Sequence, residues 1–188
     1  MRVSRELVAE HRQRILDAAS TLFREHGFDG IGIADIMKAA GMTHGGFYRH
    51  FKSREDLLEQ ACTRAMAHSA ERWENIIGDG SDPASALSLL RAMYLSSAHR
   101  SALGRGCAVA ALGMDAARQP GPVRKSFASG FNVLADKLTR LVPGTTAAVR
   151  RRRALVSLTQ MVGALVIARA VDDAKLSAEV LTAALDDR

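Results

Sequence analysis

Apolar side chains recur at spacings of three and four residues through most of this sequence, and that periodicity restricts the chain to helical folds. The clearest example is the segment 5–26, where one helix side collects Ile15, Leu16, Ala18, Ala19, Leu22 and Phe23. The sequence shows no strand-like alternation, internal repeat or low-complexity tract. The pattern predicts an all-α protein with about nine helices.

Glycines mark the ends of the first two predicted helices. Gly27 ends the helix 5–26 and Gly41 ends the helix 33–40, because glycine adopts the left-handed cap conformation without steric cost. A third and shorter helix follows Thr43, whose hydroxyl is suited to cap a first-turn amide, and ends at about residue 50 or 51. The first 51 residues are therefore expected to form three helices separated by tight turns.

The remaining chain carries its own start and stop signals. Ser53 with Asp56 three residues later is a capping-box pattern that opens a helix over 54–77. The segment 78–83 is the clearest break, after which Asp82 caps a helix and Pro83 occupies its first position. Apolar periodicity predicts the further helical segments 83–98, 107–114, 123–142, 146–171 and 177–185.

The formal net charge of +6 says little by itself about a nucleic-acid partner. Acidic and basic residues are equal in number over residues 1–60, so the whole excess comes from the rest of the chain. Phosphate contacts are made locally, and the stretch 43–54 holds five potentially cationic side chains and no carboxylate. This stretch follows the turn at Gly41 and Met42, as a helix-turn-helix requires to set one helix end against DNA.

Enzyme and metal-site signatures are absent from the sequence. There is no glycine-rich phosphate loop after a strand, no HExxH and no GxSxG. His44 and His50 do not have the spacing of metal ligands on one helix face, and neither do His99 and Cys107. We therefore expect a protein that is not an enzyme and that holds no metal or cofactor.

The sequence also indicates a compartment. The longest apolar run, Met161–Ala168, is far shorter than the roughly 20 residues of a membrane span. No signal peptide opens the chain, so a cytoplasmic protein without membrane contact is expected. Cys62 and Cys107 show no CxxC spacing, which predicts two buried free thiols and leaves a redox role for Cys107 open.

Three blocks in the first 60 residues together form a specific pattern. They are Ile15-Leu16-Asp17-Ala18-Ala19 with Leu22-Phe23 and Gly27-Phe28, then Asp35-Ile36 with Ala39-Ala40-Gly41, then Gly45 with Phe47-Tyr48-Arg49-His50-Phe51-Lys52-Ser53-Arg54-Glu55-Asp56-Leu57. Residues 11–60 thereby resemble the DNA-binding head of the TetR family of transcriptional regulators. Members often open the second helix with Thr or Ser, whose hydroxyl touches a phosphate, and here Ile31 and Gly32 stand instead.

The resemblance implies a helix-turn-helix DNA-binding domain over 1–54 and a helical effector-binding and dimerisation domain over 55–188, with the helix 54–77 connecting them. It implies contact with double-stranded DNA through Thr43, His44, Gly45, Gly46, Tyr48, Arg49, His50, Lys52 and Arg54. His44 stands where a base is read, and a histidine can donate to guanine N7 or O6. Phe47 and Phe51 are interpreted as core residues on the opposite face.

The chemistry of each residue suits this assignment. Gly45 and Gly46 each cost a helix about 1 kcal/mol against alanine, so their presence indicates close backbone approach to a partner. Tyr48 and His50 can bond phosphate oxygens, and Lys52 and Arg54 flank the next helix start as further phosphate contacts. A lone histidine or a surface cation can equally be a solvated side chain, and that alternative stays open for each residue.

A single head is too small for a specific operator, so a homodimer on a near-palindromic site is expected, with recognition helices about 34 Å apart. The predicted dimer face lies on the segments 123–142 and 146–171 and includes Phe131, Leu134, Leu138, Gly163, Ala164, Ile167 and Ala168. An effector cavity is predicted beside it, lined by Met93, Tyr94, Cys107, Met114, Phe127, Phe131 and Met161. Packing inside one chain is the alternative for both groups.

The sequence therefore predicts a DNA-binding repressor that an unidentified small-molecule effector releases from its operator. Activation in place of repression is not distinguished by these residues. The alternative is a ligand-binding or interaction protein whose helix-turn-helix no longer binds specific DNA. The neutral charge of residues 1–60 favours this alternative, and the cationic stretch 43–54 favours DNA binding.

Overall fold

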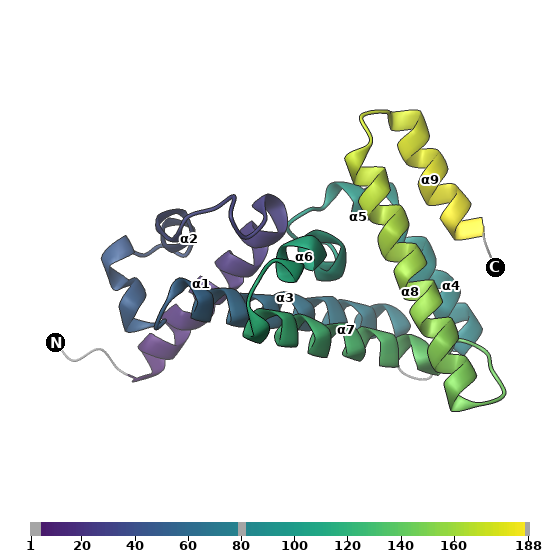
Figure 1. The fold of residues 1–188 in the computed structure, drawn as a ribbon, viewed down its shortest axis with the longest axis horizontal. Helices are drawn as coiled ribbons and strands as arrows, with labels where there is room; N and C mark the ends of the chain where they lie inside the picture. The colour runs from purple at the N-terminus through teal and green to yellow at the C-terminus, as the bar shows by residue number, and fades with distance from the viewer. Residues whose placement is uncertain (1–4, 79–81, 187–188) are drawn as a thin grey trace.

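The structure is a computed structural model that describes residues 5–78 and 82–186, and this part of the chain is helical throughout (Figure 1). The predicted all-α class is confirmed. The described residues form nine α-helices and one 3-10 helix: α1 (Arg5–His26), α2 (Ile33–Ala39), η1 (His44–Arg49), α3 (Arg54–Ile77), α4 (Pro83–Tyr94), α5 (Ser97–Ser101), α6 (Ala108–Ala117), α7 (Gly121–Leu141), α8 (Ala147–Ala170) and α9 (Ala174–Asp186).

The glycine caps are confirmed by backbone geometry. Gly27 and Gly41 both have φ of +74°, a conformation that favours glycine because it lacks a Cβ. Gly41 has a second reason to be glycine, since a Cβ there would lie 2.6 Å from Arg14 Nη2. That nitrogen donates a hydrogen bond of 2.7 Å to the carbonyl of Ala40, which ties α1 to the end of α2.

Both predicted side-chain caps of the longer helices are present. The Ser53 hydroxyl accepts from the Asp56 N–H at 3.2 Å, and the Asp56 carboxylate accepts from the Lys52 N–H at 2.9 Å. Asp82 accepts from the Ser85 N–H at 2.9 Å with Pro83 in the first turn of α4. Residues 79–81 of the predicted break at 78–83 lie outside the described residues.

Two predictions about helix geometry were wrong in detail. Thr43 occupies the N-cap of the third helix, but its hydroxyl makes no capping bond, and the Gly46 N–H bonds the Thr43 carbonyl at 3.0 Å instead. This helix is a 3-10 helix. The predicted helix 83–98 is two helices, because α4 ends at Tyr94 and the Ser96 hydroxyl accepts from the His99 N–H at 3.1 Å to begin α5.

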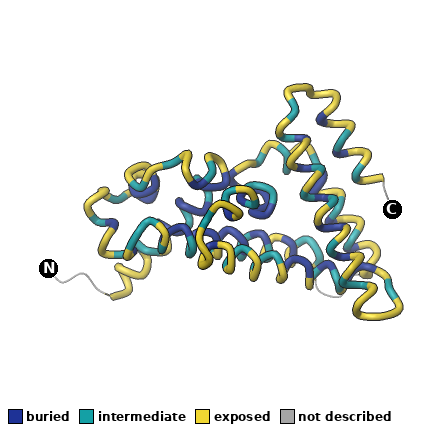
Figure 2. Tube along the Cα trace, in the orientation of Figure 1, coloured by how far each residue is buried: buried dark blue, intermediate teal, exposed yellow. Residues whose placement is uncertain are grey.

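The molecule is elongated, with α1, α2 and η1 at the N-terminal end and α8 and α9 at the C-terminal end (Figure 1). The long helix α3 runs from this head into the body, where it lies along α7 and buries one side against it (Figure 2). Gly130 permits the approach of the two helices, because a Cβ there would lie 2.7 Å from Met66 Cγ. The head is thus joined to the body by a continuous helix.

Among the described residues, α8 is the one helix long and apolar enough, by length and composition alone, to cross a membrane. Its inner side, with Leu158, Met161 and Leu165, is fully buried against the chain's own helices. It packs against α7 and α9, and the Arg151 guanidinium donates to Asp136 on α7 at 2.7 Å. These contacts make α8 a core helix of the body.

Candidate nucleic-acid interface

Two phenylalanines anchor η1 on the head. Phe47 is fully buried and Phe51 is 2% exposed, and their rings stack with centroids 5.6 Å apart. Phe28 folds back on the last turn of α1 and meets Phe23 edge-on at 5.3 Å. The prediction that Phe47 and Phe51 belong to the core is confirmed, and their burial fixes the orientation of the short helix.

The outer side of η1 carries side chains that have no internal role. Tyr48 is 74% exposed, and His44 and Arg49 are also exposed. Within the described part of the chain, the side chains of His44 and Arg49 make no hydrogen bond or ion pair, and Tyr48 makes only an edge contact with Phe47 at 5.1 Å. Three polar groups therefore stand free on a rigid support.

The backbone at the start of η1 is open. A Cβ added at Gly45 would meet no atom within 4 Å, and one at Gly46 would reach Met37 Cε at an ordinary 3.6 Å. Both glycines have negative φ, so their conformation does not require glycine either. Nothing in the described chain therefore requires a glycine at position 45.

His50 is more enclosed than its neighbours. Burial lowers the pKa of His50, and the nearby His11, Arg12 and Arg49 lower it further, so the ring is neutral at neutral pH. The His11 ring lies edge-on with its centroid 6.3 Å away. His50 Nδ1 is buried and has no hydrogen-bond partner among the described residues.

The cations at the end of the stretch 43–54 divide into a free one and a bound one. The Lys52 side chain is exposed, and its ammonium group has no hydrogen-bond or ion-pair partner among the described residues. The Arg54 guanidinium donates to the carbonyl of Phe28 and, at 3.2 Å, to the Asp29 carboxylate. Arg54 therefore braces the loop after α1, and phosphate contact by this residue stays a prediction.

One supporting residue gave no signal in the sequence. The Arg12 guanidinium lies 5.1 Å from the centre of the Phe51 ring and donates to the Gln60 side chain. Gln60 in turn donates to Asp56, the capping residue of α3, at 2.5 Å. Because Arg12 is far from Gln60 in sequence and belongs to a different helix, spacing alone could not reveal that it fixes α1 to the start of α3.

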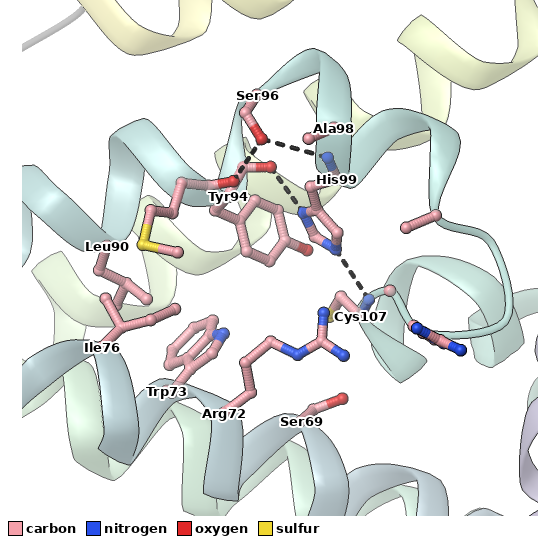
Figure 3. A pocket seen from close by; sticks show the side chains of 14 residues that line it. Ser69, Arg72, Trp73, Ile76, Leu90, Tyr94, Ser96, Ala98, His99 and Cys107 are labelled. Carbon is pink, nitrogen blue, oxygen red and sulfur yellow. Dashed lines mark hydrogen bonds between the residues drawn. The ribbon is translucent and has the colours of Figure 1, made fainter.

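A cavity of about 290 Å³ lies in the body at α3, α4 and the segment from α5 to α6 (Figure 3). Of the predicted lining residues, Met93, Tyr94 and Cys107 are in its wall. Met114 is 68% exposed and Met161 is fully buried in the core, while Phe127 and Phe131 pack against the core, and none of the four lines this cavity. The lining comprises Ser69, Arg72, Trp73, Ile76, Leu90, Met93, Tyr94, Ser96, Ala98, His99, Ala102, Arg105, Gly106 and Cys107.

His99 holds one wall of the cavity in place. Its Nδ1 donates to the Tyr94 carbonyl at 2.7 Å, and its Nε2 accepts from the Cys107 N–H at 2.9 Å (Figure 3). These partners require the neutral ring with the proton on Nδ1. Burial lowers the pKa of His99 and favours this form.

The cavity and the head are joined by a buried arginine. Arg24, near the end of α1, donates to the Ser20 carbonyl at 2.9 Å and to the Gly106 carbonyl in the cavity wall at 3.2 Å. Burial lowers the pKa of Arg24 to about 10, so the side chain stays charged at neutral pH. A second connection runs from the Phe28 N–H to the Asp115 carboxylate on α6 at 3.4 Å.

Comparison with known proteins agrees with this architecture. The family model described as "Bacterial regulatory proteins, tetR family" matches residues 15–61. A TetR transcriptional regulator from Chloroflexus aurantiacus has a similar structure, with a TM-score of 0.77 at 25% identity over 95% of this chain and 93% of that one. The chain belongs to the TetR family.

Curated HTH-type transcriptional regulators match part of the chain. The regulator AcrR of Shigella flexneri is 41% identical over 59 residues, 31% of this chain and 27% of that protein. The repressor KstR2 of Mycolicibacterium smegmatis is 30% identical over 95 residues, 50% of this chain and 46% of that protein. The chain thus spans about a quarter to just under half the length of these relatives.

The TetR fold extends over the whole described chain. The reduced form of Escherichia coli NemR matches with a TM-score of 0.77 at 20% identity over 94% of this chain and 93% of that one. TetR-family members are transcriptional regulators, which agrees with the prediction that the chain is not an enzyme. Within the described residues, no cluster of three or more His, Cys, Asp or Glu side chains could hold a metal ion.

The departure noted for the second TetR helix is visible in the structure. Gly32 is the N-cap of α2 and provides no side-chain cap, and Ile31 packs partly buried against the core. The start of α2 therefore offers backbone amides to a phosphate and no hydroxyl.

The predicted dimer residues divide between the surface and the core. Leu134 and Leu138 are fully buried and Ala168 is 3% exposed, so the structure contradicts their assignment to an outer face. They pack against the chain's own helices because the inner sides of α7 and α8 face one another. Gly163 and Ile167 are exposed, with Ala164 and Phe131 half-buried beside them.

Proposed function

We propose that this TetR-family chain is a sequence-specific DNA-binding transcriptional repressor that acts as a homodimer on a near-palindromic operator and is released by a small-molecule effector. The observation that carries the proposal is the outer side of η1, where exposed polar groups without internal partners stand on a helix locked by Phe47 and Phe51. The family and its curated repressors support regulation of transcription. Such a protein works in the cytoplasm, where the DNA is.

In this proposal the start of η1 enters the major groove. His44 reads a base edge, while Tyr48, Arg49 and His50 bond phosphates on either side. The open backbone at Gly45 lets the helix approach the groove closely. Lys52 adds a phosphate contact by charge, and Arg54 contributes mainly by holding the loop at Phe28 and Asp29.

The dimer uses the outer side of α8. Large apolar residues are exposed on that side: Val156 is 59% exposed, Ile167 is 50% exposed and Val166 is 39% exposed. Gly163 lies among them and would present no side chain to a symmetry mate. A two-fold contact between such faces is isologous and sets two heads at a fixed spacing, as a palindromic site requires.

Release follows from the connection between cavity and head. Gly106 lines the cavity and accepts a hydrogen bond from Arg24 of α1, so a ligand that displaces this wall also displaces α1. A ligand that binds better to one spacing of the two heads shifts the population toward that spacing. Operator affinity falls when the favoured spacing no longer fits the two half-sites.

Selection of purified protein on random duplex DNA, at two salt concentrations, tests the proposal. We expect the selected sequences to share an inverted repeat. The double variant Arg49→Ala, Lys52→Ala should lose affinity for this repeat. Lys175→Ala, an exposed lysine on α9, is the matched control and should bind as wild type.

The competing function is a ligand-binding protein whose head no longer reads DNA, and the missing hydroxyl at the start of α2 favours it. Three results together would support that function and contradict the repressor proposal. The protein would bind DNA without sequence preference, binding would vanish at the higher salt, and the double variant and Lys175→Ala would bind equally. Light scattering on the free protein tests the dimer separately, and Ile167→Asp should convert a dimer to a monomer.

A further inference from the structure

The cavity has an apolar end and a cationic end. Trp73, Ile76 and Leu90 line one side, and His99 and Cys107 lie on the other, with Arg72 between the two groups (Figure 3). At about 290 Å³ the volume is at the lower end of the roughly 300–1,000 Å³ typical of ligand pockets. A small molecule with one apolar and one polar end fits this division.

The polar end carries positive charge that no acidic side chain offsets. Arg72 and Arg105 line the cavity with side chains that are also exposed to solvent, and within the described residues neither makes a hydrogen bond or an ion pair. No Asp or Glu is among the lining residues. The neutral His99 ring is already bonded to Tyr94 and Cys107, so it does not add or remove charge.

Two further guanidinium groups, of Arg24 and Arg169, lie behind this wall. Among the described residues neither forms an ion pair, although the nearby Glu25 carboxylate raises the pKa of Arg24. Arg24 donates to the Ser20 and Gly106 carbonyls, and Arg169 donates to the carbonyls of His99 and Arg100 at 2.9 and 3.0 Å. The charge of Arg169 reaches the cavity, since Arg169, like Arg72, lowers the pKa of His99 in addition to the larger effect of burial. An anion is the missing element in this cluster of cations.

The wall also holds a buried polar group without an oxygen or nitrogen partner. Tyr94 is 3% exposed, and its hydroxyl bonds no oxygen or nitrogen among the described residues. The Cys107 thiol, a weak hydrogen-bonding group, lies beside it and adds to the larger effect of burial in raising the pKa of Tyr94. The ring stands between Trp73, with centroids 6.1 Å apart, and His99, with centroids 4.7 Å apart. A buried hydroxyl without a strong hydrogen-bond partner costs free energy, and a ligand that accepts a hydrogen bond from it would recover that cost.

We propose that this cavity binds a small organic carboxylate, whose anionic group is held by Arg72 and Arg105 with the Tyr94 hydroxyl and whose apolar body packs on Trp73 and Leu90. A guanidinium binds a carboxylate through two parallel hydrogen bonds, which a lysine cannot match. The aromatic side chains give an apolar body a large contact surface. The inference rests on the proposed function in one respect, that the occupant of this cavity is the effector.

Three probes of equal shape and different charge test the ligand class: hydrocinnamate, its neutral amide hydrocinnamamide, and the cationic phenylpropylamine. Trp73 is the only tryptophan in the chain and lies in the cavity wall, so its fluorescence reports binding without DNA. We expect hydrocinnamate to bind at least tenfold more tightly than the amide, and phenylpropylamine to bind most weakly. Higher salt should reduce the preference for the acid.

Arg72→Gln and Arg105→Gln remove the charge and should abolish the preference for the acid, while the amide still binds. Arg118→Gln removes an exposed arginine at the end of α6, outside the cavity, and should leave the preference unchanged. Tyr94→Phe removes the hydroxyl alone and should weaken the acid more than the amide. Circular dichroism verifies that each variant is folded.

Equal affinity for acid and amide would overturn the proposal, as would a preference that survives both cavity variants. No change in Trp73 emission with hydrocinnamate or other aryl and alkyl carboxylates of that size, up to millimolar concentration, would also overturn it. A separate operator-binding assay isolates the proposed function. If hydrocinnamate binds as expected and operator affinity does not change, the carboxylate site stands and its role as the effector site is wrong.

Discussion

Replacement of Gly45 by alanine separates the stability of the head from its contact with DNA. An added Cβ at this position meets no atom within 4 Å, and φ is negative, so the folded chain accommodates alanine without strain. Gly→Ala at a compatible site stabilises a protein by about 0.4–1 kcal/mol, because the unfolded chain loses freedom. For a protein of this size that corresponds to a rise in Tm of about 1–4 °C.

The effect on DNA binding should have the opposite sign. If the η1 backbone approaches the groove closely, the new methyl group meets the DNA, and overpacking of this kind costs about 1–3 kcal/mol. Operator affinity then falls by about 5- to 150-fold for each half-site. The assays are thermal unfolding for stability and fluorescence anisotropy with the selected operator for affinity.

Gly121→Ala is the matched control. An added Cβ there also meets nothing within 4 Å, φ is again negative, and the residue lies at the start of α7 far from η1 in the sequence. It should leave operator affinity unchanged. The reasoning is refuted if Gly45→Ala binds the operator as wild type does, since the open space at position 45 would then not be used by DNA.

Three further predictions concern salt, packing and pH. Lys52→Ala should weaken binding to all sequences alike and lower the salt slope by about 0.9 per head, measured against Lys175→Ala; a loss confined to one operator variant would contradict this. Gly130→Ala should lower the free energy of unfolding, measured by urea titration, by about 1–3 kcal/mol, because the new Cβ would lie 2.7 Å from Met66 Cγ. An unchanged urea midpoint would refute the close approach of α3 and α7. Burial lowers the pKa of His99 from its usual 6.5, so near and below that pH the unfolded chain binds more protons than the folded chain, and the free energy of unfolding falls on acidification. His99→Gln should flatten this fall in stability. An equal fall in the variant would assign the pH dependence to other groups.

The head could be predicted from the sequence because its signals are local. The left-handed glycines at 27 and 41 and the Ser53 cap each act within a few residues, and each was found as expected. The separation of buried Phe47 from exposed Tyr48 likewise follows from helical periodicity over adjacent positions. Local patterns were therefore enough to predict which side chains of η1 are buried and which are exposed.

The cavity and the dimer face could not be predicted in the same way. Arg72 and Arg105 come from distant segments and look like ordinary solvated charges until the fold brings them to one cavity. Periodicity marks Leu134 and Leu138 as apolar, but it cannot tell whether the same chain or a second copy covers them. Arg54 has the same ambiguity, since its acceptor at the Phe28 carbonyl is found only in the folded head.

The residues of η1 that hold the helix in place differ from the residues proposed to contact DNA. Because the His44 side chain makes no contact that holds the head together, a substitution there should, under the proposed function, alter the preferred operator without a cost in stability. A library at position 44 should therefore explore new operator sequences on an unchanged scaffold, while changes at positions 48 and 49 should alter affinity for all sequences alike. The same freedom allows duplicated copies of such a gene to acquire separate operators by few mutations, with the buried pair Phe47 and Phe51 kept constant.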